Sequence, residues 1–141
     1  MSIAAVVFDL DGVLLNSEVA WNEAKQELVY ETGGHWQDDA PRAMMGMSSP
    51  EWSRYLHEEL GVPLQPPEIN HAVVDRLAAR YRQRLPLIDG APEAVERLAA
   101  RWPLGLASSS NRPIIDLVLE SSGLGRHFAA TFSSEEVARG K

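Results

Sequence analysis

An apolar run near the N-terminus, Ile3 to Phe8, ends abruptly in the acidic turn sequence Asp-Leu-Asp-Gly at residues 9–12. Short continuous apolar runs rich in β-branched residues are typical of parallel strands that are covered on both faces. We therefore predict a parallel strand here, with a polar turn at its carboxyl end. Parallel strands are joined through crossover helices, so this feature restricts the chain to an α/β fold.

Two further strands are predicted near the C-terminus, each followed by serine residues. They cover Leu104 to Ala107 and Phe128 to Phe132. Helices are predicted over Pro92 to Arg101 and over Pro113 to Ser122, the second with Asn111 as its N-cap. The alternation of helix and strand predicts right-handed crossovers within one parallel sheet.

The segment between the first and second predicted strands has a different pattern. Apolar residues recur at helical spacing in two stretches, at Trp21, Ala24 and Leu28 and at Ile69, Val73, Leu77 and Tyr81. Pro50 to Leu60 is a third helical candidate, and nothing in the segment alternates as a strand does. We therefore predict that residues 16–85 form a helical domain inserted into an α/β domain made of residues 1–15 and 86–141.

The charge balance excludes two classes of partner. The chain has 20 Asp plus Glu against 13 Lys plus Arg, a net charge of −7, and no cysteine. An acidic protein is poorly matched to nucleic-acid phosphates or to an anionic membrane surface, so we expect neither as a partner. The first apolar run is interrupted at Asp9, well short of the roughly 20 residues that a membrane-spanning helix needs. We expect a cytoplasmic protein.

Asp9 and Asp11 lie at the predicted carboxyl end of the first strand, where open α/β sheets bind ligands. Gly12 allows the chain to turn sharply and to bring backbone N–H groups near an anion. Two carboxylates at this spacing can divide the work, one attacking or binding a metal while the other transfers protons. The same pattern is also typical of a simple turn that ends a strand, and the acidic residues alone leave both interpretations open.

The flanking residues add a family resemblance. Val6 to Leu15, which reads Val-Val-Phe-Asp-Leu-Asp-Gly-Val-Leu-Leu, resembles the first motif of the haloacid dehalogenase-like phosphohydrolase superfamily. Leu106 to Asn111 is similar to the second motif in the branch of phosphoglycolate phosphatases and β-phosphoglucomutases, with Ser108 at the matching position. Gly140-Lys141 is similar to the third motif. The resemblance implies a Rossmann-like three-layer core with a parallel sheet and an inserted helical cap.

The resemblance also implies a Mg²⁺-dependent phosphatase that hydrolyses a small phosphorylated metabolite through an aspartyl phosphate. Asp9 would attack the phosphoryl group and bind the metal, and Asp11 would transfer protons while its carbonyl group also binds the metal. Ser108 and the N–H groups after it would hold the phosphoryl oxygens, and Lys141 would neutralise charge beside Asp9. The substrate-binding residues expected are Gly12, Gly46, Ser109 and Asn111.

The fourth family motif, an acidic pair that completes the metal site, is expected downstream of Lys141, so the chain resembles a family member truncated at the Lys motif. Glu135 and Glu136 precede that motif, and we expect them to begin a short helix instead. Without the strand that carries the acidic pair, the first strand becomes an edge of the sheet. An unpaired apolar edge predicts self-association through this strand.

The sequence leaves three alternative functions open. Sugar phosphomutases of the β-phosphoglucomutase type have a His shortly after the first motif; here the stretch Glu18 to Trp21 contains Ala20, which favours a phosphatase. A catalytically silent phosphate-binding or interaction module agrees with the absent fourth motif. A receiver-like signalling domain also uses aspartate and Mg²⁺ on a parallel sheet, but it has no long helical insertion after the acidic strand.

Overall fold

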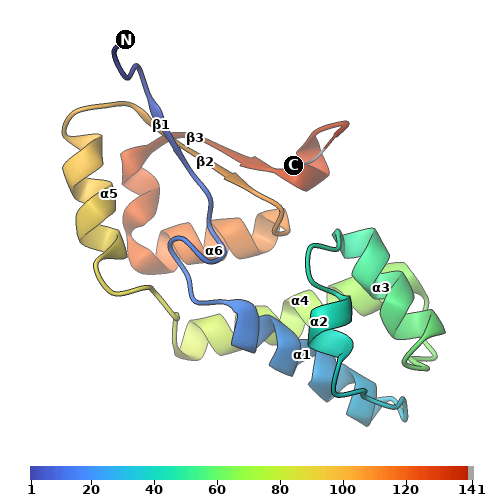
Figure 1. Cartoon of the computed structure of the whole chain (residues 1–141). Coiled ribbons are helices and arrows are strands. Elements are labelled where there is room, and N and C mark those ends of the chain that lie inside the picture. Colours follow the sequence, from blue (N-terminus) through green and yellow to red (C-terminus); the bar gives the residue numbers. More distant parts are fainter. Residues whose placement is uncertain (140–141) are drawn as a thin grey trace. The chain divides into compact units, whose positions relative to one another are not determined.

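The computed structural model describes residues 1–139 and divides the chain into two compact units (Figure 1). The first unit contains Met1–Glu18 and the described residues from Arg80 onward, and the second is Val19–Ala79. We keep residues 16–85 as the proposed extent of the inserted domain, of which the second unit is the compact part.

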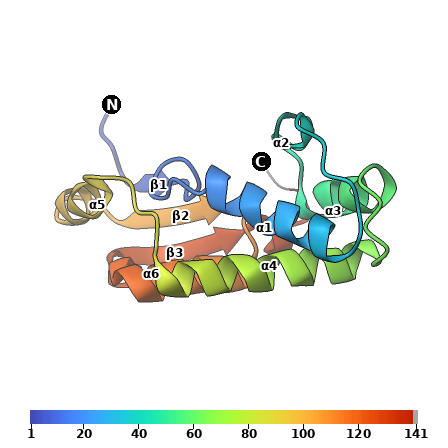
Figure 2. The same ribbon diagram turned by 90° about the horizontal axis from the view of Figure 1, so that it is seen from below.

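The first unit is built on a three-stranded parallel sheet (Figure 2). Its strands, in spatial order, are β1 (Val6–Phe8), β2 (Leu104–Ser108) and β3 (Phe128–Ser133). Val6 pairs with Leu104, and Phe8 pairs with Leu106. The predicted α/β class with a parallel sheet is therefore confirmed, and within the described residues β1 is an edge strand, as expected.

Short helices connect and follow the strands of this unit. They are α5 (Ala91–Ala99), α6 (Arg112–Ser122) and the 3₁₀ turns η1 (Leu124–His127) and η2 (Ser134–Glu136). The start of α6 after Asn111 agrees with the prediction, and the helix ends at Gly123 in the left-handed conformation with φ 72°. Glu135 and Glu136 begin a short helix as expected, because they belong to η2.

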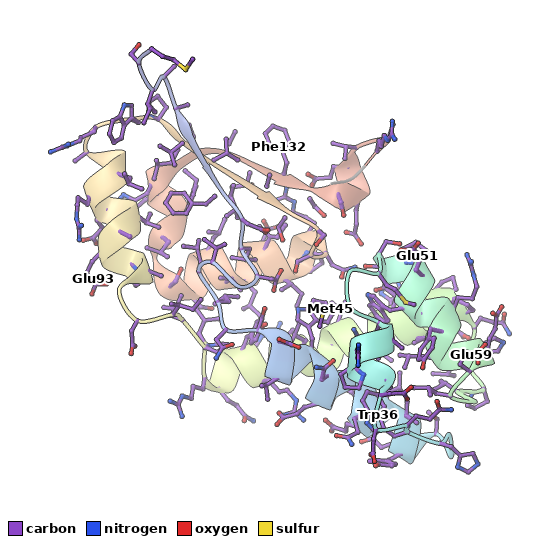
Figure 3. The ribbon with its side chains drawn as sticks, in the orientation of Figure 1. Trp36, Met45, Glu51, Glu59, Glu93 and Phe132 are labelled. Carbon is purple, nitrogen blue, oxygen red and sulfur yellow. The ribbon has the colours of Figure 1, made fainter. Side chains whose placement is uncertain are left out.

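The two faces of the sheet differ in burial. Leu104 and Leu106 on β2 are 2% and 0% exposed, whereas Val7 on β1 is 69% exposed and Phe132 on β3 is 54% exposed. The side chain of Phe132 is labelled in Figure 3. The expectation that the first strand is covered on both faces is therefore wrong at Val7. The second helical layer of the predicted three-layer core does not cover Val7 or Phe132 in the described part of the chain.

The first strand is also shorter than the predicted run that starts at Ile3. Because β2 begins at Leu104, directly opposite Val6, the residues before Val6 have no partner strand in β2. Ile3 is accordingly exposed. The apolar pattern thus identified the strand correctly and overestimated its length.

Two segments that lead into and out of the helical insertion are hydrogen-bonded to each other within the first unit. The Asn16 N–H donates to the Pro86 carbonyl at 2.8 Å, and the Ile88 N–H donates to the Leu14 carbonyl at 2.9 Å. Leu15, which is fully buried, forms an antiparallel bridge with Leu87 between these bonds. The turn after β1 is therefore fastened to the segment that leads into α5.

The described residues of the second unit form helices and no strand, as predicted. The helices are α1 (Glu18–Glu31), α2 (Ala40–Ala43), α3 (Ser49–Glu58) and α4 (Pro66–Gln83), whose last residues extend into the first unit. Figure 2 shows α1 beside α4, and an ion pair between Arg76 and Glu31 joins these two helices. Ile69 and Val73 on α4 are fully buried, in agreement with the predicted apolar face. No helix within residues 1–139 is long and apolar enough to cross a membrane.

Candidate active site

The turn after β1 is anchored by a buried leucine between two aspartates. Leu10 is 0% exposed, and its carbonyl accepts the N–H groups of Leu14 and Leu15 at 2.9 and 3.1 Å. Gly12 has φ +79°, a backbone conformation that favours glycine. This geometry leaves Asp9 exposed at the end of β1, where its carboxylate accepts the Leu10 N–H at 2.7 Å.

Asp11 is held by three serine hydroxyl groups. The Ser17 hydroxyl donates to Oδ1 at 2.6 Å, and the Ser110 hydroxyl donates to Oδ2 at 2.6 Å. The Ser108 hydroxyl is 3.4 Å from the same Oδ2 atom. All three serines are at most 5% exposed. The turn after β1 and the loop after β2 therefore converge on one carboxylate, as the shared carboxyl ends of parallel strands predict.

The loop after β2 owes its shape to serine contacts. The Ser110 N–H donates to Ser108 Oγ at 3.0 Å, and the Ser133 hydroxyl at the end of β3 donates to the Ser110 carbonyl at 2.7 Å. Ser133 is 1% exposed. Ser109, between the two inward serines, is exposed, and its carbonyl accepts the Ser134 hydroxyl at 3.3 Å.

Asn111 occupies the N-cap position of α6, but its side chain does not cap the helix. Its Nδ2 group instead donates to Glu135 Oε1 at 2.6 Å, and the Arg112 N–H donates to Glu135 Oε2 at 3.1 Å. The Arg112 guanidinium also pairs with Glu136 at 2.6 Å. This hydrogen bond lowers the pKa of Glu136 to about 2, with a further contribution from the Ser133 N–H. These contacts fasten the loop after β2 to η2.

Tyr81, near the end of α4, lies within the first unit, close to Asp11 and Ser17. Its side chain is 2% exposed, and burial is the main cause that raises the pKa of its hydroxyl. The negative charge of Asp11 raises the pKa further, while Ser17 opposes the shift. Tyr81 therefore stays neutral beside the carboxylate.

The structure brings some of the predicted site residues together. Asp11 and Ser108 meet directly, and Asp9, Gly12, Ser109 and Asn111 lie in the same two loops. Gly46 belongs to the second unit, where it has φ +79° just before Ser48, the N-cap of α3. Lys141 lies outside the described residues.

Four residues that surround Asp11 or hold the loop after β2 were not predicted from the sequence: Ser17, Tyr81, Ser110 and Ser133. The second motif contains Ser110, but nothing in the sequence distinguishes it from the exposed Ser109. The four-residue apolar spacing predicts that Tyr81 lies on an apolar helical face, and nothing in the sequence places it near Asp11.

The donor atoms at this site suit a hard cation. Asp9 and Asp11 offer carboxylate and carbonyl oxygens, and Mg²⁺ sites commonly combine one or two carboxylates with water and substrate phosphate. Among residues 1–139, no group of three or more acidic, His or Cys side chains is arranged to hold a metal. Asp9 and Asp11 therefore offer oxygen atoms of the kind that a Mg²⁺ site uses.

The sheet and the acidic turn define an open α/β protein, a class in which ligands generally bind at the carboxyl ends of the strands. A family model described as haloacid dehalogenase-like hydrolase matches residues 3–141. The chain therefore belongs to the haloacid dehalogenase-like hydrolase family, which confirms the resemblance of its motifs.

Named relatives of the chain act on phosphorylated compounds. Hexitol phosphatase B of Escherichia coli (strain K12) is 28% identical, over 99% of this chain and 64% of that protein. Phosphorylated carbohydrates phosphatase of Thermotoga maritima is 27% identical, over 97% of this chain and 64% of that protein. The crystal structure of a putative β-phosphoglucomutase from Thermotoga maritima superposes with a TM-score of 0.76 at 26% identity, covering 99% of this chain and 65% of that chain. The chain thus spans slightly less than two thirds of the length of these proteins.

Proposed function

We propose that the protein is a Mg²⁺-dependent phosphatase that hydrolyses small organic phosphate monoesters through an aspartyl phosphate on Asp9. The observation that carries this proposal is the meeting of the acidic turn after β1 with the serine loop after β2, through the contacts of Asp11 with Ser108 and Ser110. Family membership and the phosphatase relatives support the same reaction class.

In the proposed first step, an Asp9 carboxylate oxygen attacks phosphorus, and the bond from phosphorus to the ester oxygen breaks. Asp11 gives its proton to the departing oxygen, so that the product leaves as a neutral alcohol. In the second step, water attacks phosphorus and gives a proton to Asp11, while the bond from Asp9 to phosphorus breaks. Asp9 and Asp11 return to their starting states, and inorganic phosphate is released.

Other residues would position the phosphate and neutralise its charge. Ser108 and the backbone N–H groups after it would donate to the phosphoryl oxygens. Lys141 would contribute a positive charge beside Asp9, as the family resemblance implies. The Asp9 carboxylate and the Asp11 carbonyl would hold Mg²⁺, which would neutralise charge between the nucleophile and the phosphate dianion.

The proposed substrate is a small phosphorylated metabolite. The names of the relatives make phosphorylated hexitols and carbohydrates the first compounds to test. Gly12, Ser109 and Asn111 would contact the substrate from the first unit, and Gly46 stays a predicted substrate-binding residue of the cap.

Two alternatives have specific support. A β-phosphoglucomutase-like activity is favoured by the structural match, although Ala20 offers no proton-transferring group in the stretch after the first motif. A catalytically silent phosphate-binding module is favoured by the lack of a three-acid metal cluster among residues 1–139.

Hydrolysis of p-nitrophenyl phosphate and of sorbitol 6-phosphate, with Mg²⁺ and with EDTA, tests the proposal. We expect Mg²⁺-dependent phosphate release that is lost in Asp9→Asn and kept in the matched control Asp75→Asn, an exposed position on α4. Folded protein that binds phosphate without turnover would support the silent module. Conversion of one sugar phosphate isomer into another would support the mutase.

A further inference from the structure

We infer that Ser110 is a positioning residue that sets the orientation of the Asp11 carboxylate. This inference rests on the proposed function, in which Asp11 transfers the proton. Ser110 donates the shorter of the two hydroxyl contacts to Asp11 Oδ2, at 2.6 Å against 3.4 Å from Ser108. The hydroxyl of Ser110 is therefore the main constraint on that oxygen from the loop after β2.

Ser110 is itself fixed through both of its backbone polar groups. Its N–H donates to Ser108 Oγ at 3.0 Å, and its carbonyl accepts the Ser133 hydroxyl at 2.7 Å. Ser110 and Ser133 are 5% and 1% exposed, so water does not compete freely for these bonds. The end of β3 thus holds Ser110, and Ser110 holds the carboxylate at the end of β1.

Another contact of Asp11 comes from a different part of the chain. Ser17 donates to Oδ1 from the segment that leads into α1, so the two oxygens are held from two sides. Ser110→Ala removes the shorter of the two hydroxyl contacts that the loop after β2 makes with Oδ2 and leaves the Ser108 hydroxyl 3.4 Å from that atom, so the carboxylate is held less firmly in its observed orientation. A proton donor that rotates is poorly aligned with the departing oxygen, and alignment is a large part of catalysis by positioned groups.

The leaving group provides a readout that separates positioning from a general structural defect. p-Nitrophenolate is a weak base that departs without protonation, whereas the alkoxide of sorbitol 6-phosphate needs the proton of Asp11. We expect Ser110→Ala to lower kcat/KM for sorbitol 6-phosphate about tenfold more than for p-nitrophenyl phosphate. This difference is smaller than the full contribution of general acid catalysis, because the variant keeps Asp11. Ser133→Ala removes the hydrogen bond to the Ser110 carbonyl and leaves the Ser110 hydroxyl in place. It should also lower kcat/KM more for sorbitol 6-phosphate than for p-nitrophenyl phosphate, but by a smaller factor than Ser110→Ala.

Ser121→Ala, the same substitution at an exposed position on α6, is the matched control and should leave both activities unchanged. Equal losses for the two substrates in folded Ser110→Ala would overturn the inference, and if that variant does not fold, equal losses in Ser133→Ala decide in the same way. Lack of turnover by the unmodified protein refutes the proposed function instead. In that case crystal structures decide the positioning role, because an unmoved Asp11 side chain in either serine variant overturns it.

Discussion

Lys25 is a buried ammonium group whose replacement should stabilise the protein in a pH-dependent way. It is 7% exposed on α1, and its Nζ atom lies 4.8 Å from the ring centroid of Trp52 and 5.7 Å from that of Trp21. Burial lowers the pKa of Lys25 from 10.5 to about 8. Between these two values the unfolded chain binds a proton that the folded chain has released, so stability rises with pH across this window.

The lowered pKa corresponds to a cost of about 3 kcal/mol for keeping Lys25 charged in the folded state near pH 7. Because a pKa shift reflects all interactions of the charged group, including those with the two rings, we expect Lys25→Met to stabilise the protein by up to about 3 kcal/mol near pH 7. Near pH 10 the folded protein holds Lys25 neutral, and the advantage of the variant should shrink by about 2 kcal/mol.

Urea unfolding of the unmodified protein and of Lys25→Met near pH 7 and near pH 10 measures both quantities. Gln26→Met, a neighbouring substitution on α1, is the control and should show no such pH dependence. The reasoning is refuted if Lys25→Met is destabilised near pH 7, or if its difference from the unmodified protein is the same at both pH values.

Three further predictions concern an ion pair, a backbone conformation and an exposed strand. Glu136→Gln removes a carboxylate whose pKa Arg112 lowers from 4.5 to about 2. The ionised Glu136 stabilises the fold above pH 4.5, and this stabilisation is lost as the pH falls toward 2. The urea midpoint of the variant should therefore fall less steeply with decreasing pH than that of the unmodified protein, and an unchanged slope would contradict the prediction. Gly12→Ala places a side chain at φ +79° and should cost about 1 kcal/mol in thermal unfolding, more than Gly105→Ala, where the added Cβ meets only ordinary contacts. We propose self-association through β1; Val7→Lys, which puts a charge on this exposed edge strand, should then lower the dimer fraction in analytical ultracentrifugation, and an unchanged dimer fraction would exclude β1 as the contact.

The positions of the strands and helices could be predicted from the spacing of apolar residues, because that spacing shows which side chains can be buried on one face. The α4 face at Ile69 and Val73 is an example, since both are fully buried where the four-residue spacing placed them. Val7 shows the limit of the same reasoning. An apolar residue in a strand is buried only where another element covers it, and the composition of the strand does not reveal that cover.

The candidate site was predicted only in part for a related reason. The motif identified Ser108, but it did not distinguish the exposed Ser109 from the buried Ser110, because their burial depends on the position of Ser133 on another strand. Asn111 was correctly placed as the N-cap, yet its side chain reaches Glu135, a contact across 24 residues of sequence. Contacts between loops that are distant in sequence leave no periodic pattern, and so they required the structure.

The central claim is that Asp9 carries the phosphoryl group, and the location of a covalent phosphate tests it most directly. The protein would be mixed with p-nitrophenyl phosphate and Mg²⁺, quenched in acid during turnover and digested for peptide mass spectrometry. We expect a phosphate adduct on the peptide that contains Asp9, with no adduct in Asp9→Asn. Turnover without an adduct on this peptide, or an adduct that persists in Asp9→Asn, would contradict the account.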